Sequence, residues 1–299
     1  MNTPRDHHYV PQFFLRNFAV DPEAKKITTV AKHGQRAVWA TRSIESLGFE
    51  RDLYVHLQSG IPISVETSIN ERIENPISKS DTWAKITSGR TDELDRSDKP
   101  ILYALIRHLE VRTPHYMATA QELAELAASP TNTIAFTEEE REMYAEMRSS
   151  PEVAKAHFNA MSATLEWTEN NFRGAGLSIF RSPIPLRSST TPVLVLPAPS
   201  HPSLYLPLPG MTPFQLILTL SKTTIASLVL GDFDDAFNNI EIGSEIAKGF
   251  NRHFVGQFAF FDHVRHLITD RQNLADDMTW APYRMIEESE RKITFQRRS

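Results

Sequence analysis

The segment from Arg5 to Phe18 gathers side chains that could do chemistry. It reads RDHHYVPQFFLRNF and places two adjacent imidazoles, a carboxylate, amide groups and two guanidinium groups among aromatic and apolar residues. Polar groups of that density are costly to bury unless they are paired. This segment, called here the N-terminal motif, therefore forms either a reactive site or a hydrogen-bonded lock that fixes the N-terminus onto the core.

His7 and His8 are neighbours, so their side chains point to opposite faces of a strand, and on a helix they diverge by about 100°. One of them is expected at a site, and the other is expected to be structural. A histidine near a glutamate such as Glu66 can act as a general base, or as one arm of a carboxylate-rich metal site for phosphodiester hydrolysis. Arg16 or Arg112 would then hold a phosphate or a carboxylate through a bidentate fork.

Two other interpretations stay open. In the first, Asp6, His8, Arg16 and Arg112 tie the N-terminal motif to a long helix as a buried polar network. In the second, the same groups line a pocket that binds a ligand without catalysis. Perturbed polar clusters arise in scaffolds as well as in sites, so the residue types alone do not separate these cases.

The elements that must position these residues follow from the periodicity of the apolar residues. Strands are expected at residues 26–30 and 36–40, joined by a turn that contains glycine. A helix is expected to begin near Glu66, since Ile69 and Ile73 recur on one face.

The middle of the chain is predicted to be helical. Residues 98–129 have the strongest helical periodicity, and Pro114 must kink or divide that helix because it lacks an amide donor. Thr137 is expected to cap a second helix, with Glu140 completing a capping box. Residues 151–172 are expected to continue as an amphipathic helix.

Short strands are expected in the second half, where Pro, Ser, Thr and β-branched residues become frequent. They are predicted at residues 178–180, 193–196, 203–206, 216–220 and 225–228. The many prolines between them favour edge strands and loops, and hence an antiparallel sheet or a pair of small sheets.

A helix is expected to return over residues 234–252. His253, His263 and His266 lie in or near a segment rich in phenylalanine, where packing rather than metal binding is expected. The stretch 269–299 is polar and is predicted to be a peripheral tail.

Together these elements predict an α+β fold, with an N-terminal hairpin, a helical middle, and antiparallel strands and a returning helix in the C-terminal half. Residues 1–268 are expected to form a single domain, and residues 269–299 the peripheral C-terminal tail.

The composition narrows the classes of function. The chain has 299 residues, a formal net charge of -5 and no cysteine. This charge gives no global field that would attract nucleic acid, although a local basic patch remains compatible with it. Disulfides, thiolate zinc sites and cysteine nucleophiles are excluded, so any metal would need His, carboxylate or amide ligands. The sequence shows no signal-peptide pattern and no apolar run of about 18 residues, which predicts a cytoplasmic protein without a membrane span.

The N-terminal motif resembles the HHYVP-Q-F-(Y/F)-L-R-N-F signature with which the bacterial domain of unknown function (DUF) 4238 family begins. Arg112-Thr113-Pro114 resembles that family's Arg-Thr-Pro element, and residues 206–213 resemble its proline-containing strand. Glu66 lies where members tend to carry a glutamate, and Asn251 resembles a late helical asparagine. Where the family often reads Thr-Ser-Asp-x-Pro, this chain has Thr190 in place of the aspartate. If that aspartate is catalytic or a ligand in other members, the chemistry is lost or rearranged here.

The expected function is that of a bacterial hydrolase of nuclease type, acting in defence or as a toxin-like effector, with nucleic acid as its partner and a divalent metal as a candidate cofactor. The alternative is a non-enzymatic module that binds a small anion or a protein partner through the same polar cluster. The candidate catalytic residues are His7, His8, Glu66 and Arg112. The candidate binding residues are Gln12, Arg16, Asn17, Thr190 and Asn251.

Overall fold

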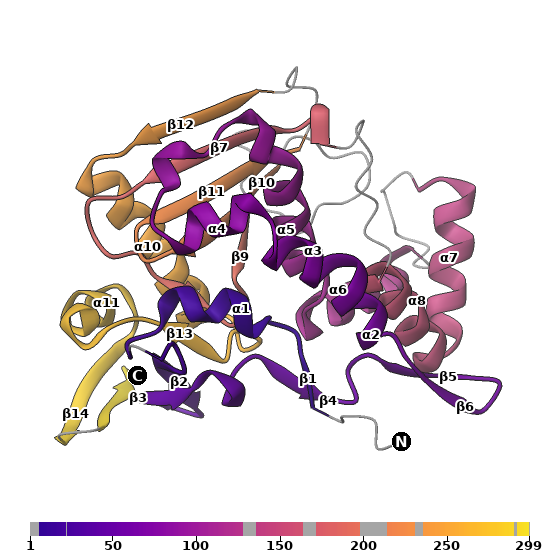
Figure 1. Ribbon diagram of the computed structural model, residues 1–299. Coiled ribbons are helices and arrows are strands. Elements are labelled where there is room, and N and C mark those ends of the chain that lie inside the picture. The colour runs from indigo at the N-terminus through magenta and orange to yellow at the C-terminus, as the bar shows by residue number, and fades with distance from the viewer. Residues whose placement is uncertain are drawn as a thin grey trace.

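The computed structural model describes residues 6–21, 23–127, 136–163, 172–197, 214–230, 236–289 and 292–298. A five-stranded sheet and a six-stranded sheet carry the fold, with helices packed over and beside them (Figure 1). The five-stranded sheet contains, in spatial order, β12 (Phe237–Glu241), β7 (Gly176–Arg181), β11 (Thr224–Val229), β10 (Phe214–Ser221) and β9 (Val193–Pro197). Its strands are antiparallel except that β12 runs parallel to β7.

The six-stranded sheet contains the predicted hairpin. In spatial order its strands are β14 (Tyr283–Ser289), β15 (Lys292–Arg297), β3 (Arg36–Ser43), β2 (Lys26–His33), β13 (His266–Ile268) and β8 (Ser188–Ser189). All its pairs are antiparallel. Two smaller pairs join β1 (Asp6–His8) to β4 (Phe49–Arg51) and β5 (Val55–Gln58) to β6 (Ile61–Ser64).

The α-helices are α1 (Gln12–Leu15), α2 (Glu66–Ile69), α3 (Asn75–Ser78), α4 (Asp81–Thr87), α5 (Lys99–Val111), α6 (Pro114–Ala127), α7 (Glu138–Ser149), α8 (Pro151–Ala163), α10 (Ser244–Phe260) and α11 (Leu274–Trp280). A π-helical turn over Asn70–Glu74 connects α2 to α3. Pro114 divides the long helix as predicted, and Thr137 forms the expected capping box with Glu140. The combination of helices and antiparallel sheets confirms the α+β fold.

Two cores hold these layers together. In the first, α4 and α5 lie across one face of the five-stranded sheet, and Leu105 and Leu109 of α5 are buried in the same cluster as Leu216 and Leu218 of β10 (Figure 1). The second core joins both sheets to α10 and α11. Burial of such aliphatic and aromatic side chains is the main favourable term in folding.

Two predictions in the C-terminal half are wrong. The expected helix over residues 234–252 is interrupted, because residues 237–241 form strand β12 and α10 begins only at Ser244. In β12 the half-buried Phe237 and Asn239 alternate with exposed neighbours, which is the period of a strand rather than a helix.

The expected peripheral tail is wrong as well. Strand β15 pairs with β3, and Tyr283, Ile293 and Phe295 are buried in the second core. In β15 the buried Ile293 and Phe295 alternate with the more exposed Thr294 and Gln296, so this strand looks polar in sequence although one of its faces is buried. The predicted strand at residues 203–206 and the end of the predicted helix, residues 164–171, lie outside the described residues.

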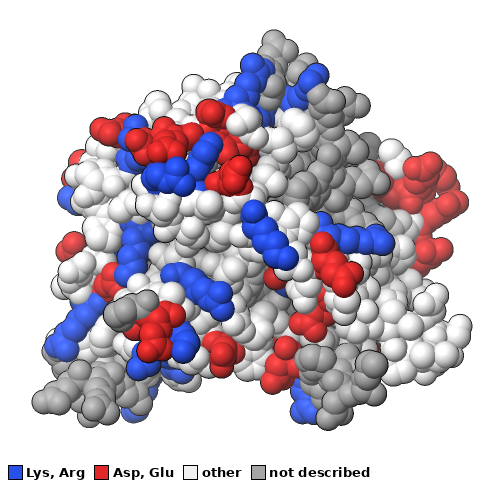
Figure 2. All heavy atoms as spheres, viewed as in Figure 1, with Lys and Arg blue, Asp and Glu red and all other residues white. Residues whose placement is uncertain are grey.

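The surface viewed in Figure 2 mixes both signs of charge. Lys and Arg are interspersed with Asp and Glu over the centre of this face, and acidic side chains gather over α7 at its edge. No described helix is long and apolar enough to cross a bilayer. An anion that binds to the face shown would therefore contact a local group of arginines rather than a broad basic surface.

Candidate functional site

The N-terminal motif is fixed to the rest of the chain at β4. Strand β1 pairs with β4 in antiparallel register, and the amides of Tyr9 and Val10 both donate to the carbonyl of Gly48, at 2.7 and 3.0 Å. Gly48 has φ +63°, and a Cβ there would lie 2.7 Å from the Cβ of Val10. Only glycine fits this position without strain, because it needs both a left-handed backbone and close approach of another chain segment.

The apolar side of the motif is buried in the first core. Tyr9, Val10, Phe14, Leu15 and Phe18 expose at most 3% of their surface. Leaving so much apolar surface in water would be costly, so the motif is an integral part of the fold.

His7 lies on the inner side of β1. Its side chain is fully buried, and its Nδ1 accepts a hydrogen bond of 3.0 Å from the backbone amide of Tyr54. Because Nδ1 is an acceptor, the ring proton of the neutral form sits on Nε2. That Nε2 lies 3.5 Å from Oε2 of Glu66, a separation longer than a normal hydrogen bond.

Arg112 holds the centre of the same region. Its Nε donates to the Tyr54 hydroxyl at 2.9 Å, its Nη1 contacts Glu74, and its Nη2 donates to the carbonyl of His8. The Tyr54 hydroxyl in turn donates to the Arg112 carbonyl at 3.1 Å. Burial by itself would raise the pKa of Glu74, but the charge of Arg112 and the hydrogen bonds from Arg112 and His108 together outweigh it and lower that pKa to about 2. Glu74 is therefore ionised at neutral pH and neutralises the buried arginine.

His108, one turn before Arg112 on α5, completes this arrangement. Its Nε2 lies 2.7 Å from Nη1 of Arg112, and because a guanidinium can only donate, this nitrogen is the acceptor. Burial and the charge of Arg112 lower the pKa of His108 to about 4, so its ring is neutral at pH 7. We call the six residues His7, Tyr54, Glu66, Glu74, His108 and Arg112 the inner network.

The inner network contains some of the polar residues that were predicted to converge on the N-terminal motif. The prediction that Arg112 reaches the N-terminal motif is confirmed by its bond to the His8 carbonyl, and its carboxylate partner is Glu74 rather than Glu66. It is His7, not His8, that approaches Glu66. The side chain of His8 is half-buried and points away, with Nε2 3.1 Å from the Glu45 carbonyl.

The other predicted residues of the motif do not converge on this network. Asp6 and Arg16 are exposed, so the predicted buried network that included them is wrong in those two members. Gln12 is half-buried, and no described residue contributes a hydrogen bond to its side chain. Asn17 donates to the Leu220 carbonyl at 2.9 Å and so ties the motif to β10.

Asn251 belongs to a different buried cluster. Its amide oxygen accepts from the backbone of Arg187 at 2.9 Å, and its amide nitrogen donates to the Pro185 carbonyl at 3.1 Å. Arg187 pairs with the fully buried Asp277, with Nε 2.9 Å from Oδ1, and Thr269 donates to the other oxygen of that carboxylate at 2.6 Å. All these groups are satisfied by each other, which is the signature of a structural network.

Thr190 lies beside a cavity on the outer side of the motif. Its backbone amide donates to the His266 carbonyl at 3.0 Å, and its hydroxyl accepts from the His266 amide at 3.2 Å. The neighbouring cavity has a volume of about 360 Å³. Its lining residues are Tyr9, Ser46, Gly48, Phe49, Glu50, Arg51, Arg265 and His266, and we call it the outer cavity.

Charged groups surround the imidazole that lines the outer cavity. Burial, together with the charges of Arg42 and Arg265, lowers the pKa of His266 to about 4, so this ring is neutral at pH 7. Arg265 Nη2 lies 2.9 Å from Oε2 of Glu50, close enough for an ion pair although the two atoms are not aligned for a hydrogen bond. The side chain of Arg51 is 63% exposed, and among the described residues its ion-pair contact is with Asp52, at 3.8 Å.

In the part of the chain that the structure describes, Nε of Arg42 and Nδ1 of His266 are buried without a hydrogen-bond partner, and Oε2 of Glu50 accepts no hydrogen bond although it is ion-paired with Arg265. Buried polar atoms in native proteins are almost always paired, so unpaired ones mark the place of a water, an ion or a ligand. The outer cavity thus combines accessible guanidinium groups, a neutral imidazole and unsatisfied polar atoms. The inner network also contains two such atoms, Nε2 of His7 and Nδ1 of His108, but its histidines and its arginine are buried, whereas the outer cavity is open to solvent through the exposed Arg51.

No three His, Asp or Glu side chains in the described parts of the chain converge to hold a metal ion. The predicted carboxylate-rich metal site therefore finds no ligand set there. His7 and Glu66 are the only two of its proposed members that meet among the described residues.

Several residues of both sites were not predicted from the sequence. The spacing of four between His108 and Arg112 on one helix could have indicated that they meet. Glu74 and Tyr54 carry no such local signal. His266 was assigned to aromatic packing, although the adjacent Arg265 could have indicated a polar environment.

Comparison with known protein families assigns the chain to one family. Residues 6–259 match the model of the family described as "Protein of unknown function (DUF4238)". The matched range includes the N-terminal motif, the inner network and β4, and it ends shortly before Arg265 and His266. No curated protein and no solved structure matches the chain.

Proposed function

We propose that this chain, which belongs to the DUF4238 family, is a phosphodiester hydrolase of nuclease type with its reaction centre in the outer cavity. The observation that carries the proposal is the position of the neutral His266 imidazole in an accessible cavity with Arg51 and Arg265. A base of this kind, next to cations that can hold a phosphate, is what hydrolysis of a phosphodiester needs.

The arginines would bind the scissile phosphate. A guanidinium matches two phosphate oxygens through two parallel N–H bonds, and Arg51 and Arg265 both reach the cavity. Arg265 is paired with Glu50, so a bound phosphate would compete with that carboxylate for the guanidinium. The charge of Arg42 adds to the attraction from behind His266.

His266 would act on the attacking water. The imidazole takes a proton from water as the water oxygen forms a bond to phosphorus, and the bond between phosphorus and the leaving oxygen breaks. The leaving oxygen takes a proton from solvent water, and the imidazolium returns its proton to the solvent. A pKa of about 4 keeps the imidazole unprotonated at neutral pH, so it is available as a base, although the same low value makes it a weak one.

The inner network would serve this site indirectly. It fixes β1 through the bond from Arg112 to the His8 carbonyl, and β1 in turn holds β4, which supplies Glu50 and Arg51. Residues held by paired strands and a buried ion pair keep their geometry better than residues on loops.

One observation favours the non-enzymatic alternative. The unpaired Nε of Arg42 and the group of guanidiniums would recognise a small anion even if no bond were broken. If substitution of His266 lowers the rate of cleavage but not the affinity for the nucleic acid, the cavity is a catalytic site rather than only a binding site.

The deciding experiment measures cleavage and binding with the same preparations. The full chain is incubated with single-stranded DNA, double-stranded DNA and RNA, with EDTA or with Mg²⁺ or Mn²⁺, and binding of a labelled oligonucleotide is measured in parallel. His266→Gln should lower cleavage by about 100-fold or more while retaining binding. The control is His253→Gln, which replaces an exposed imidazole on α10 and should change neither.

Arg51→Gln tests the role of the arginines, because it should weaken binding without changing the pH dependence of cleavage. Cleavage by His266→Gln at the rate of the wild type would refute the assignment of the base. Binding of the oligonucleotide or of inorganic pyrophosphate by the wild type, without cleavage under any of these conditions, would replace the hydrolase with the anion-binding module.

A further inference from the structure

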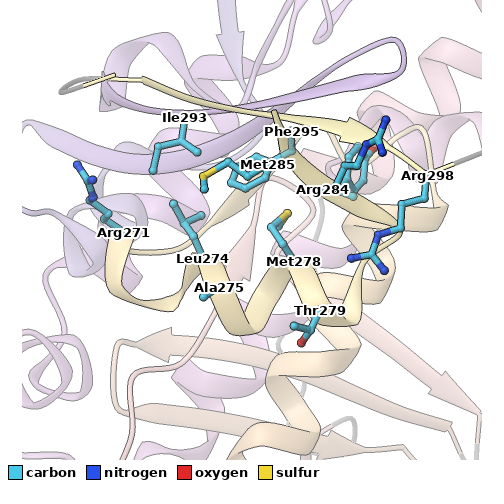
Figure 3. Close-up of a pocket in the computed structure, with 11 residues that line it drawn as sticks. Arg271, Leu274, Ala275, Met278, Thr279, Arg284, Met285, Ile293, Phe295 and Arg298 are labelled. Carbon is cyan, nitrogen blue, oxygen red and sulfur yellow. The ribbon is translucent and has the colours of Figure 1, made fainter. Parts of the chain in front are cut away.

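A second cavity, called here the C-terminal pocket, lies between α11 and the β14–β15 hairpin (Figure 3). Its volume is about 400 Å³. Small-molecule sites typically have volumes of about 300–1,000 Å³, so a compact ligand would fit. All its lining residues fall between 271 and 298, outside the residues 6–259 that match the family. It shares no lining residue with the outer cavity and no residue with the inner network, so it is separate from both sites described above.

The floor of the C-terminal pocket is apolar. Leu274 and Met278 of α11 and Ile293 and Phe295 of β15 are buried at its base. Figure 3 shows the side chains of the hairpin facing those of α11 across the pocket. An apolar lining with a few polar groups at the edge is the usual composition of a ligand site.

Met285 closes one side of this floor. It remains 56% exposed although it lies next to the second core. The pairing of β14 with β15 shifts register between Met285 and Glu287, as at a β-bulge or a similar irregularity. Bulges re-aim side chains and are common beside functional sites, and a methionine adapts its shape to an apolar ligand.

The rim of the pocket is cationic. Three of the eleven lining residues are arginines, Arg271, Arg284 and Arg298, and none is Asp or Glu. Arg284 and Arg298 lie at one end of the pocket and Arg271 at the other (Figure 3). The side chains of Arg284 and Arg298 are exposed and have no ion-pair or hydrogen-bond partner among the described residues.

We propose that the C-terminal pocket binds a single-chain amphiphile, with its alkyl chain on the Leu274–Phe295 floor and its anionic head, a carboxylate or a phosphate, between Arg284 and Arg298. The apolar floor favours the chain because its burial removes hydrocarbon from water. The guanidiniums of Arg284 and Arg298, which have no ion-pair partner among the side chains that the structure describes, favour the head because charge-assisted hydrogen bonds to an anion are strong and specific. The occupant is a monomeric amphiphile rather than a bilayer, since the floor is recessed between two elements.

Isothermal titration calorimetry with decanoate tests the pocket. The full chain should bind decanoate saturably with a stoichiometry of one, and decanol and decyltrimethylammonium should bind much more weakly. Arg284→Gln and Arg298→Gln should each weaken decanoate binding by about tenfold, the effect expected for loss of one charge-assisted hydrogen bond. Both side chains are exposed, so neither variant threatens the fold.

Two further variants distinguish binding in the pocket from a general effect of net charge on decanoate affinity. Arg36→Gln removes the same charge from an exposed arginine on β3 that does not line the pocket, and it should bind decanoate as the wild type does. Ala275→Trp fills the pocket from the exposed side of α11 and should abolish binding. A thermal melt of each variant checks that it is folded.

Three results would overturn the proposal. They are absence of saturable decanoate binding, equal losses in Arg36→Gln and Arg298→Gln, and equal affinity for decanol and decanoate. Cosedimentation with phosphatidylglycerol vesicles in the absence of decanoate binding would also overturn it, since the partner would then be an anionic lipid surface.

Discussion

Nη2 of Arg112 donates to the backbone carbonyl of His8, joining the end of α5 to the first described strand across 104 residues of sequence. The same guanidinium contacts Glu74 and the Tyr54 hydroxyl, so one buried cation ties together β1, the π-helical turn and the loop before β5. A guanidinium suits this role because it presents five donors in a fixed plane and stays charged when buried. Removal of this side chain would leave several buried partners unsatisfied at once.

Arg112→Met should therefore be strongly destabilising. Breaking a buried ion pair by removing one partner costs about 3–5 kcal/mol, because the other charge is left uncompensated. Chemical denaturation of the variant should show a loss of free energy of unfolding in that range. The double variant Arg112→Met/Glu74→Gln should recover part of it, since the orphaned carboxylate is then neutral. Arg16→Ala, at an exposed arginine, serves as the control and should change the free energy by less than about 0.5 kcal/mol.

His7 and His8 should differ sharply in their effect on stability. His7→Ala leaves the buried amide of Tyr54 without its acceptor, and an unsatisfied buried group of this kind costs about 1–3 kcal/mol. His8→Ala removes a half-buried ring that, among the described residues, makes a polar contact with the Glu45 carbonyl alone, so its cost should be smaller. Melting temperatures of the two variants, measured side by side, test this difference. A larger loss for His8→Ala would show that the inner face of β1 has been assigned wrongly.

Stability should fall as the pH is lowered, in two stages. The pKa of His108 is lowered to about 4 in the folded protein, so between its ordinary value of 6.5 and pH 4 the unfolded chain binds a proton that the folded protein does not. The pKa of Glu74 is lowered to about 2, so its contribution is complete above its ordinary value of 4.5 and is lost between that pH and about 2. His263 and His266, whose pKa values are also lowered to about 4, act in the first window with the same sign.

Denaturation curves recorded between pH 8 and about pH 2 would measure both stages. His108→Gln should flatten the dependence between pH 6.5 and 4 relative to the wild type, because it removes one of the groups that resist protonation. His253→Gln replaces an exposed imidazole and should leave the curve unchanged. An increase in stability on acidification through this window would contradict the neutral, buried state of His108.

Features with a local cause could be predicted from the sequence. The hairpin of β2 and β3, the helix that begins at Glu66 and the division of the long helix at Pro114 all follow from periodicity or from the missing amide of proline. The arrival of Arg112 at the N-terminal motif was also predicted, because the break after it frees the side chain from the helix face. The predictions that were wrong concern elements that form by pairing between distant segments. The strand β15 looks like a polar tail until β3 is placed beside it.

The choice between the two adjacent histidines shows the same limit. Alternation along a strand places His7 and His8 on opposite sides, but nothing local says which side faces inward. The pairing of β1 with β4 decides it. In the same way, Thr190 and His266 meet only because β8 and β13 are neighbours in the sheet, although 76 residues separate them. His266 lies in an aromatic stretch of the sequence, and its imidazole was therefore interpreted as a packing group.

Gly48→Ala should disturb the site without touching any of its polar groups. The added methyl group would lie 2.7 Å from the Cβ of Val10, and the backbone φ of +63° is strained for any residue with a Cβ. We expect a cost of about 1–3 kcal/mol in unfolding free energy, with faster amide exchange at Tyr9 and Val10, whose donors both end at the Gly48 carbonyl. Gly34→Ala is the control, because its φ is also positive but no atom lies within 4 Å of the added Cβ. Equal effects of the two substitutions would show that the contact with Val10 does not matter.

Thr190→Asp tests whether the outer cavity has been altered by the loss of an acid. The chain resembles a family that often carries aspartate at this position, and here the Thr190 hydroxyl accepts from the His266 amide at 3.2 Å. A carboxylate could accept the same bond, and its negative charge would lie next to an imidazole whose pKa is lowered to about 4. Because an opposite charge favours the protonated ring, Thr190→Asp should raise the pKa of His266 towards its ordinary value.

Thr190→Asn has the same size without the charge, so both variants share the cost of the larger side chain and only the aspartate should shift the titration. NMR titration of the His266 ring in the three proteins measures the shift directly, and in an active preparation the acidic limb of cleavage should move up in pH with it. A His266 pKa that is the same in Thr190→Asp and Thr190→Asn would show that position 190 does not control this imidazole.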